Sequence, residues 1–211
     1  MKLIDISMPI HEEMATYKGR VEKRPRRVWV SRMPGDSVNE SSLSMNLHTG
    51  THLDAPRHMK NDGWTMENMP LEKLITPCKV FDLTTVRDAI TGADLEGLGI
   101  REGDFVLFKT KNSQGLVFGP DFIFIRHDAA DYLARLGVKG VGTDALGVER
   151  DQPGHLTHLA LMNAGVLILE GLCLDQVQAG EYLLIALPLS LPGAEGAPAR
   201  AVLLDGLPAL T

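Results

Sequence analysis

Residues 48–58 concentrate side chains that can bind a metal ion or transfer a proton. The segment reads His48-Thr-Gly-Thr-His52-Leu-Asp54-Ala-Pro-Arg-His58. His48, His52 and Asp54 are the ligand types that zinc, manganese and similar divalent ions prefer. His58 has a side chain that titrates near neutral pH, as a catalytic base requires. The segment therefore predicts a metal site with an acid–base group beside it.

The backbone must bend before these side chains can meet at one ion. In a flat strand, His48 and His52 would lie roughly 13 Å apart at about 3.3 Å per residue. Two imidazoles that share an ion each lie only about 2 Å from it. Gly50 is the expected position of the bend, because it lacks a Cβ atom and tolerates positive φ. His52 and Asp54 are two residues apart and can converge without distortion.

A second set of candidate ligands lies downstream. His155 and His158 are three residues apart in a predicted helix, so both can face one way. We favour His158 as a ligand and leave open whether His155 is a ligand, a supporting residue behind the ligands or a surface residue. Glu170 ends an apolar run, where a buried carboxylate is costly unless it is paired or bound to a cation. With no local Lys or Arg in the sequence, a metal ligand is favoured over a salt bridge or an exposed strand end.

The elements that must position these residues are mostly short strands. Alternating or apolar patterns predict strands over residues 3–6, 27–32, 41–47, 78–83, 104–109, 140–142, 166–169, 182–187 and 201–204. A short helix is expected to start at 91–94 and to end near 99, and two further helices are expected over 128–136 and 155–163. One helical turn is expected within 70–75. The fold class predicted is α/β, with a mixed sheet of short strands and few helices.

Length and composition favour one ordinary globular domain over residues 1–211. The chain has 44% hydrophobic and 23% charged residues and a net charge of −6. This charge argues against nucleic-acid binding, and we expect the basic cluster 18–27 to be a solvated loop face. No signal peptide or membrane span is evident, so a cytoplasmic location without membrane contact is expected. Cys78 and Cys173 are expected to be buried thiols.

The motif from His48 to His58, followed by the His158–Glu170 pair, resembles the cyclase family of metal-dependent hydrolases. This family includes bacterial kynurenine formamidase and isatin hydrolase, and the resemblance runs from Asp5-Ile6-Ser7 to the final strands. It implies a swivelling β/β/α domain that assembles as a homodimer or homotetramer. It also implies one or two divalent ions per chain, zinc first and manganese as the alternative. The resemblance implies that His48, His52 and Asp54 are ligands of a first metal. Asp54 would bridge to a second metal held by His158 and Glu170. His58 would act as general acid/base.

The activity implied is hydrolysis of the C–N bond of a small amide, most directly by an arylformamidase with an N-formylkynurenine-like substrate. Kynurenine formamidases of the family carry a tryptophan before Pro-Gly-Asp near the start, where this chain reads Met-Ala-Thr-Tyr17-Lys-Gly. Tyr17 is therefore the candidate substrate-stacking residue. Trp64, Phe118 and Phe122 are further candidates for the wall of the site.

Two alternatives stay open. One is hydrolysis of a cyclic amide, as in isatin hydrolase, or the reverse cyclisation. The other is a metal-binding protein without turnover, against which His58 argues, because a structural metal site has no use for an adjacent free base.

The remaining polar residues are given weaker roles. Asp128, Asp144 and Glu149 are expected in caps or loops, Asn112-Ser113 near the end of a strand, and His11 and His127 at the surface or in a cap.

Overall fold

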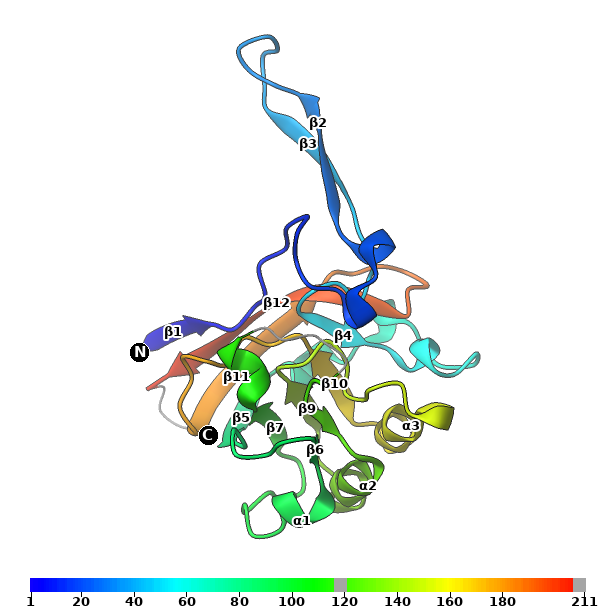
Figure 1. Ribbon diagram of the computed structural model, residues 1–211, viewed down its shortest axis with the longest axis vertical. Helices are drawn as coiled ribbons and strands as arrows, with labels where there is room; N and C mark the ends of the chain where they lie inside the picture. The colour runs from blue at the N-terminus through cyan, green and yellow to red at the C-terminus, as the bar shows by residue number, and fades with distance from the viewer. Residues whose placement is uncertain (116–120, 207–211) are drawn as a thin grey trace.

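The structure is a computed structural model that describes residues 1–115 and 121–206 (Figure 1). Phe118, one of the expected wall residues, lies outside the described residues. The strands are β1 (Lys2–Asp5), β2 (Arg26–Ser31), β3 (Glu40–Ser44), β4 (His52–Asp54), β5 (Ile75–Asp82), β6 (Ala89–Ile90), β7 (Phe105–Lys109), β8 (Phe124–Ile125), β9 (Gly140–Thr143), β10 (Leu167–Glu170), β11 (Gly180–Pro188) and β12 (Gly196–Asp205). The α-helices are α1 (Gly92–Leu95), α2 (His127–Leu136) and α3 (Leu156–Asn163).

The main sheet closes on itself through β4. Its strand order is β1-β12-β11-β5-β7-β9-β10-β4, and β4 also pairs with β12. The central strands β5, β7, β9 and β10 are parallel, whereas the neighbours β11, β12 and β4 join antiparallel. The predicted α/β class, with few helices and a core built mostly from the sheet, is confirmed.

Alternation along the central strands divides the buried side chains between two apolar clusters. In β7, Phe105 and Leu107 enter the cluster enclosed by the closed sheet, and Val106 and Phe108 enter the cluster that includes residues of the helices. Because β7 is buried on both faces, its sequence is a continuous apolar run, as is typical of parallel strands. Figure 1 shows α2 and α3 side by side against this outer face.

Local caps set the boundaries of two helices. Thr91 and Asp94 form a capping box at the start of α1, each side chain accepting from the other's backbone N–H. Gly137 ends α2 in the left-handed conformation, with φ of 75°. α2 thus begins and ends close to where the sequence predicts, whereas α1 ends at Leu95, four residues before the expected end near 99.

The observed strands differ from the prediction at four places, one of them the start of β5 at Ile75 rather than at residue 78. The strand expected over 41–47 ends at Ser44, and an irregular segment leads from it to β4. β12 begins at Gly196 rather than at residue 201, because its first residues pair with β4. β6 and β8 were not expected, and they pair only with each other.

The β2–β3 hairpin extends away from the rest of the molecule (Figure 1). It forms its own two-stranded sheet, and every side chain along β3 is exposed. No helix among residues 1–115 and 121–206 is long and apolar enough to cross a membrane.

Candidate metal and active site

The bend expected within the motif is present at Gly50. Gly50 has a φ of +64°, and Gly171 packs directly against it with a φ of +70°. A Cβ atom on Gly171 would lie 2.1 Å from the Gly50 carbonyl oxygen, so only glycine fits there without a shift. Thr51 secures the contact, because its Oγ1 donates to the Gly171 carbonyl at 2.6 Å. As a result, the ring centroids of His48 and His52 lie 5.0 Å apart.

Strand pairing brings the downstream carboxylate to the motif. In the antiparallel β4–β10 pair, His52 lies opposite Glu170, and its Nε2 is 3.2 Å from Glu170 Oε2. The same Nε2 is 3.6 Å from Asp54 Oδ1. Its Nδ1 lies 2.9 Å from the Gly50 carbonyl oxygen, which can only accept. The proton therefore belongs on Nδ1, and the Nε2 lone pair faces the two carboxylates.

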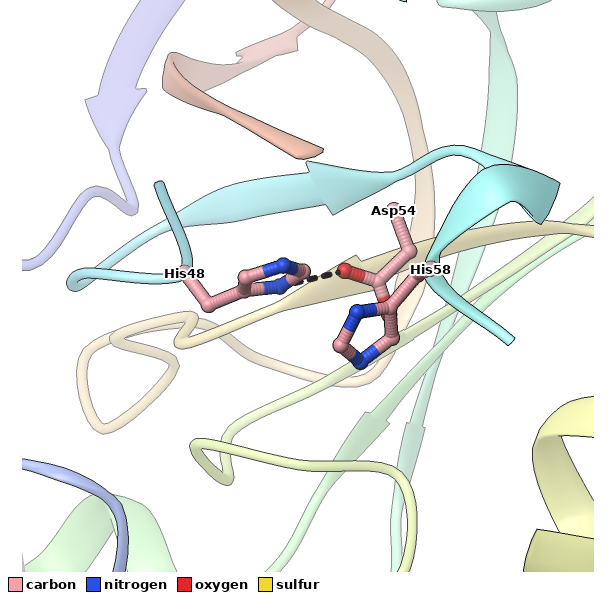
Figure 2. A group of neighbouring side chains, drawn as sticks. All are labelled: His48, Asp54 and His58. Atoms are coloured by element: carbon pink, nitrogen blue, oxygen red, sulfur yellow. Dashed lines mark ion pairs between the residues drawn. The ribbon is translucent and has the colours of Figure 1, made fainter. Parts of the chain in front are cut away.

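His48 and His58 approach Asp54 from the segments on either side of β4 (Figure 2). His48 Nδ1 is 2.9 Å from Asp54 Oδ1. His58 ends the 3-10 turn Pro56–His58, and its ring centroid is 4.1 Å from that of His48. The turn thus returns His58 to the cluster instead of leading it away.

His158 faces the other oxygen of Asp54 from the first turns of α3. Its Nε2 lies 3.5 Å from Asp54 Oδ2 and 3.7 Å from Glu170 Oε1. Asp54 therefore lies between His48 and His158 and presents one oxygen to each.

Several polar atoms in this cluster are buried without a hydrogen-bond partner among the described residues. They include His48 Nε2, His52 Nε2 and both carboxylate oxygens of Asp54. Leaving such atoms unsatisfied is costly, and it is unusual in a folded protein. Nitrogen and oxygen atoms of this kind are the donors that a zinc or manganese ion takes. The residues present fit a bound divalent cation.

The possible ligands fall into three groups. Two groups share Asp54, one with His48 and His58 and the other with His52 and Glu170. The third group contains His158, His155 and Glu149. The sequence-based division instead placed His48 with His52 and His158 with Glu170. The structure brings all five expected ligands together around Asp54, and the expected partners are also neighbours: the rings of His48 and His52 lie 5.0 Å apart, and His158 Nε2 lies 3.7 Å from Glu170 Oε1.

Glu149 is the residue of this region whose role the sequence did not reveal. It lies in a loop, as expected, but is only 2% exposed and points at two histidines. Its Oε1 is 2.6 Å from His155 Nδ1 and 3.0 Å from His158 Nδ1. Its Oε2 accepts from the backbone N–H of Thr157 at 3.1 Å, at the start of α3. Glu149 therefore orients the His158 ring so that Nε2 faces Asp54, while His155 remains half-exposed behind it.

The electrostatics reflect a buried cluster of carboxylates and imidazoles. Burial and the Asp54 carboxylate both raise the pKa of Glu170, but His158 and His52 outweigh them and lower that pKa to about 2. Burial would lower the pKa of His158, yet hydrogen bonds to Asp54, Glu149 and Glu170 hold it well above its usual value. Burial lowers the pKa of His58, despite the opposing effect of Asp54.

A cavity of about 310 Å³ opens onto the cluster. Its lining includes His48, His58, His158 and Glu170, so the candidate acid–base group and candidate ligands face the same space. Tyr17 also lines this cavity, as expected of a residue that contacts substrate. Burial raises the pKa of Tyr17 to about 12 and keeps its phenol neutral.

The other proposed wall residues do not line this cavity in the part of the chain that the structure describes. Phe122 packs behind Tyr17, with ring centroids 6.3 Å apart, and Trp64 lies elsewhere and is partly exposed. Asp144 is buried away from the cavity, where it accepts from the N–H of Thr110 and the hydroxyl of Ser113. It stabilises the loop after β7.

The remaining residues considered from the sequence take structural or surface positions. Asp128 accepts from the Gly92 N–H at the start of α1, as expected of a cap residue. Side chains of His11 and His127 are exposed. Cys78 is buried as expected, whereas Cys173 is only partly buried.

Comparison with known proteins agrees with the geometry. Residues 4–150 match the family model described as "Putative cyclase". A kynurenine formamidase from Salinibacter ruber (strain DSM 13855 / M31) is 38% identical, over 97% of this chain and 98% of its own. The solved structure of a potential metal-dependent hydrolase with cyclase activity is 51% identical with a TM-score of 0.92, covering 98% of this chain and 99% of its own. Isatin hydrolase A from Labrenzia aggregata, bound to benzyl benzoate, is 25% identical with a TM-score of 0.81, covering 97% and 94%.

Proposed function

This chain belongs to the cyclase family, and within that family we propose that it is a metal-dependent hydrolase of an aryl formamide of the N-formylkynurenine type. One observation carries the chemistry: buried ligand atoms without protein partners converge on Asp54, and His58 stands beside them in an open cavity. The full-length similarity to the S. ruber kynurenine formamidase supports the choice of substrate. In the reaction, water and the formamide yield an arylamine and formate.

The residues that would hold the ion are His48, His52, Asp54, His158 and Glu170. We propose zinc, with manganese as the alternative, because both suit shells of histidine and carboxylate. When bound, the metal supplies an activated water and polarises the scissile carbonyl group.

His58 would carry the proton. Its ring lies beside His48 at the cavity wall, where it can accept a proton from the attacking water and return it to the leaving nitrogen. His158 is held in place by Glu149, so that its Nε2 stays directed at Asp54. Because a metal-binding protein without turnover needs no free base at this position, we favour an enzyme.

The rest of the cavity suits an aromatic amino acid. Tyr17 offers a neutral aromatic ring at the wall. Lys23 and Asp151 line the same cavity, with Asp151 in an ion pair with Lys18, and they offer opposite charges to the carboxylate and ammonium groups of an amino-acid side arm. A simple aryl formamide such as formanilide lacks that arm, so we expect it to have a higher KM than N-formylkynurenine.

The test combines metal analysis with substrate comparison. Purified protein is analysed for bound metal, and hydrolysis of N-formylkynurenine, formanilide and isatin is measured before and after treatment with a chelator and re-addition of zinc or manganese. We expect bound metal and chelator-sensitive hydrolysis, with N-formylkynurenine preferred. Protein that acquires no metal under any condition would refute the proposal.

Isatin is included because the likeness to isatin hydrolase A favours a second candidate, hydrolysis of a cyclic amide. Metal-dependent cleavage of isatin, with N-formylkynurenine left intact, would establish that second candidate. Metal binding without hydrolysis of any of the three substrates would favour the non-catalytic alternative.

A further inference from the structure

The two ring nitrogens of His48 face different carboxylates. Nδ1 lies 2.9 Å from Asp54 Oδ1, within the candidate metal site (Figure 2). Nε2 lies on the other side of the ring, 3.5 Å from Glu195 Oε1. Glu195 belongs to the loop 189–195, which connects β11 to β12. His48 therefore connects the candidate metal site with a carboxylate that lies outside it.

An ion at the motif determines which nitrogen of His48 carries the proton. Asp54 is shared between two of the candidate ligand groups, and Nδ1 is the nitrogen of His48 that is turned toward it. An imidazole that binds a metal through one nitrogen carries its proton on the other, and an oxygen atom nearly always accepts from that N–H. With an ion on Nδ1, Nε2 is therefore a donor that needs an acceptor.

The Glu195 carboxylate is the acceptor within reach of this donor. His48 Nε2 is buried and has no hydrogen-bond partner among the described residues, which is costly for a polar atom. Its nearest carboxylate oxygen is Glu195 Oε1, at 3.5 Å. A normal N–H···O distance is about 2.9 Å. Because the side chain of Glu195 is 41% exposed, it has room to close that small gap.

The backbone around Glu195 is fixed against the motif. The Glu195 carbonyl accepts from the Ala55 N–H at 2.9 Å. Gly196, the next residue, pairs with Asp54 at the start of β12. A Cβ atom on Gly196 would lie 2.8 Å from His48 Cε1, so the imidazole ring packs directly against this glycine. The Glu195 side chain therefore leaves the backbone beside the ring whose Nε2 it faces.

The rest of the loop is held by the 3-10 turn Met66–Asn68. The Gly193 N–H donates to Glu67 Oε2 at 3.0 Å. A backbone hydrogen bond of 3.0 Å joins the same turn to the Ala194 carbonyl. Removing the Glu195 carboxylate should therefore leave the loop in place and remove its contact with the histidine.

We propose that Glu195 is a positioning residue for His48: it accepts from the Nε2–H and so keeps Nδ1 directed at the ion. This inference rests on the proposed metal-dependent function and adds a second supporting carboxylate to the site. Glu149 supports His158 from one side, and Glu195 supports His48 from another. Glu195 does not line the cavity, so it acts on the reaction through His48 and not through contact with the substrate.

A role for Glu195 as a further metal ligand is the competing assignment. It is less suitable, because the Glu195 oxygen and the Asp54 oxygen face different nitrogens of one imidazole ring. An ion held beside Asp54 would have the ring of His48 between itself and Glu195. The amount of metal bound at saturation separates the two roles, because loss of a ligand can empty a site that loss of a supporting residue only weakens.

The experiment compares Glu195→Ala and Glu195→Gln with the wild type, and Glu67→Ala is the matched control. Glu67 is an exposed carboxylate that contacts the same loop at Gly193 and makes no contact with His48. Zinc affinity is measured by competition with a chromophoric chelator, and bound zinc is counted at saturation. Visible spectra are recorded after cobalt is substituted for zinc. Thermal unfolding verifies that each variant folds.

Glu195→Ala should lower zinc affinity by roughly 10–100-fold, the usual effect of removing a partner that orients a metal-binding histidine. Glu195→Gln keeps a carbonyl oxygen that can accept from Nε2–H, so its loss should be smaller. Glu67→Ala should bind zinc like the wild type. The cobalt bands should shift in Glu195→Ala and not in Glu67→Ala, because they report the arrangement of the ligands. With zinc at saturation, the KM for N-formylkynurenine should stay near the wild-type value, while kcat falls.

Three results would overturn the positioning role while leaving the proposed function intact. They are wild-type zinc affinity in Glu195→Ala, an equal loss of affinity in Glu67→Ala, and loss of a whole equivalent of zinc at saturation in Glu195→Ala. A wild-type protein that binds no zinc, manganese or cobalt would refute the proposed function, and the role of Glu195 with it.

Discussion

Replacing Glu149 with glutamine tests whether this carboxylate holds the candidate metal site in shape. Glu149 is almost fully buried and contacts three groups: the Nδ1 atoms of His155 and His158 and the N–H of Thr157. Glutamine keeps the size of the side chain but has one carbonyl oxygen, and its amide NH₂ faces groups that are themselves donors. At least one of the contacts must then be lost.

The size of the effect follows from the position of Glu149 behind His158. Removing a hydrogen-bond partner that orients a metal-binding histidine typically lowers metal affinity by roughly 10–100-fold, or about 1.4–2.7 kcal/mol. We expect a loss of zinc affinity in this range for Glu149→Gln, together with a fall in the rate of formamide hydrolysis. Zinc affinity is measured by competition with a chromophoric chelator, which does not depend on activity.

Asp144→Asn provides the matched control. Asp144 is the other buried carboxylate of a loop that follows a strand of the main sheet, and it accepts hydrogen bonds from Thr110 and Ser113 instead of histidines. This variant should lower the melting temperature while leaving zinc affinity near the wild-type value. If Glu149→Gln binds zinc as tightly as the wild type, or if Asp144→Asn weakens zinc equally, the orienting role of Glu149 is refuted.

Three further predictions concern the acid–base group, the bend and the cavity wall. His58→Ala should lower kcat for the formamide by roughly 10²–10⁴-fold with bound metal nearly unchanged, and full activity would exclude His58 as the proton carrier. Gly171→Ala should lower the free energy of unfolding by more than Gly99→Ala, because both glycines have positive φ but only at Gly171 would a Cβ atom clash with the Gly50 carbonyl. Backbone strain alone costs roughly 1–3 kcal/mol, and equal losses of stability in denaturant titrations of the two variants would contradict the clash. The pKa of Tyr17 is about 12 in the folded protein, so its phenol ionises at lower pH in the unfolded chain, and this group lowers stability as the pH rises from about 10 to about 12. Tyr17→Phe should remove an ionisation step near pH 12 from the ultraviolet titration.

Local patterns in the sequence predict most of the elements because they depend on neighbours in the chain. The apolar run of β7 and the helix expected over 128–136 are examples, and the structure confirms both. The early start of β12 was not predictable in this way, because its first residues are held by β4 from more than a hundred residues upstream. Alternation likewise predicts β2 and β3, but not that they project from the body.

In the candidate site, too, the features set by neighbours in the chain were predictable and those set by distant segments were not. The bend at Gly50 was predictable, because His48 and His52 lie on either side of this glycine and must converge to share an ion. The residue types of the motif likewise predict which side chains are ligands. The contact of Gly171 with Gly50 and that of Glu149 with His158 join segments whose approach depends on the whole sheet. A glutamate in a loop carries no signal of burial in its own neighbourhood, so Glu149 was expected only to cap or to lie in a loop.

The place of β4 between β10 and β12 also sets an order of events during synthesis of the protein. Glu170 follows His52 by 118 residues, and the residues of β12 that close the sheet against β4 come later still. The motif therefore leaves the ribosome long before the groups that complete its ligand set. An ion would meet a full set of ligands only after β10 and β12 have been made, so metal loading would follow closure of the sheet instead of guiding it.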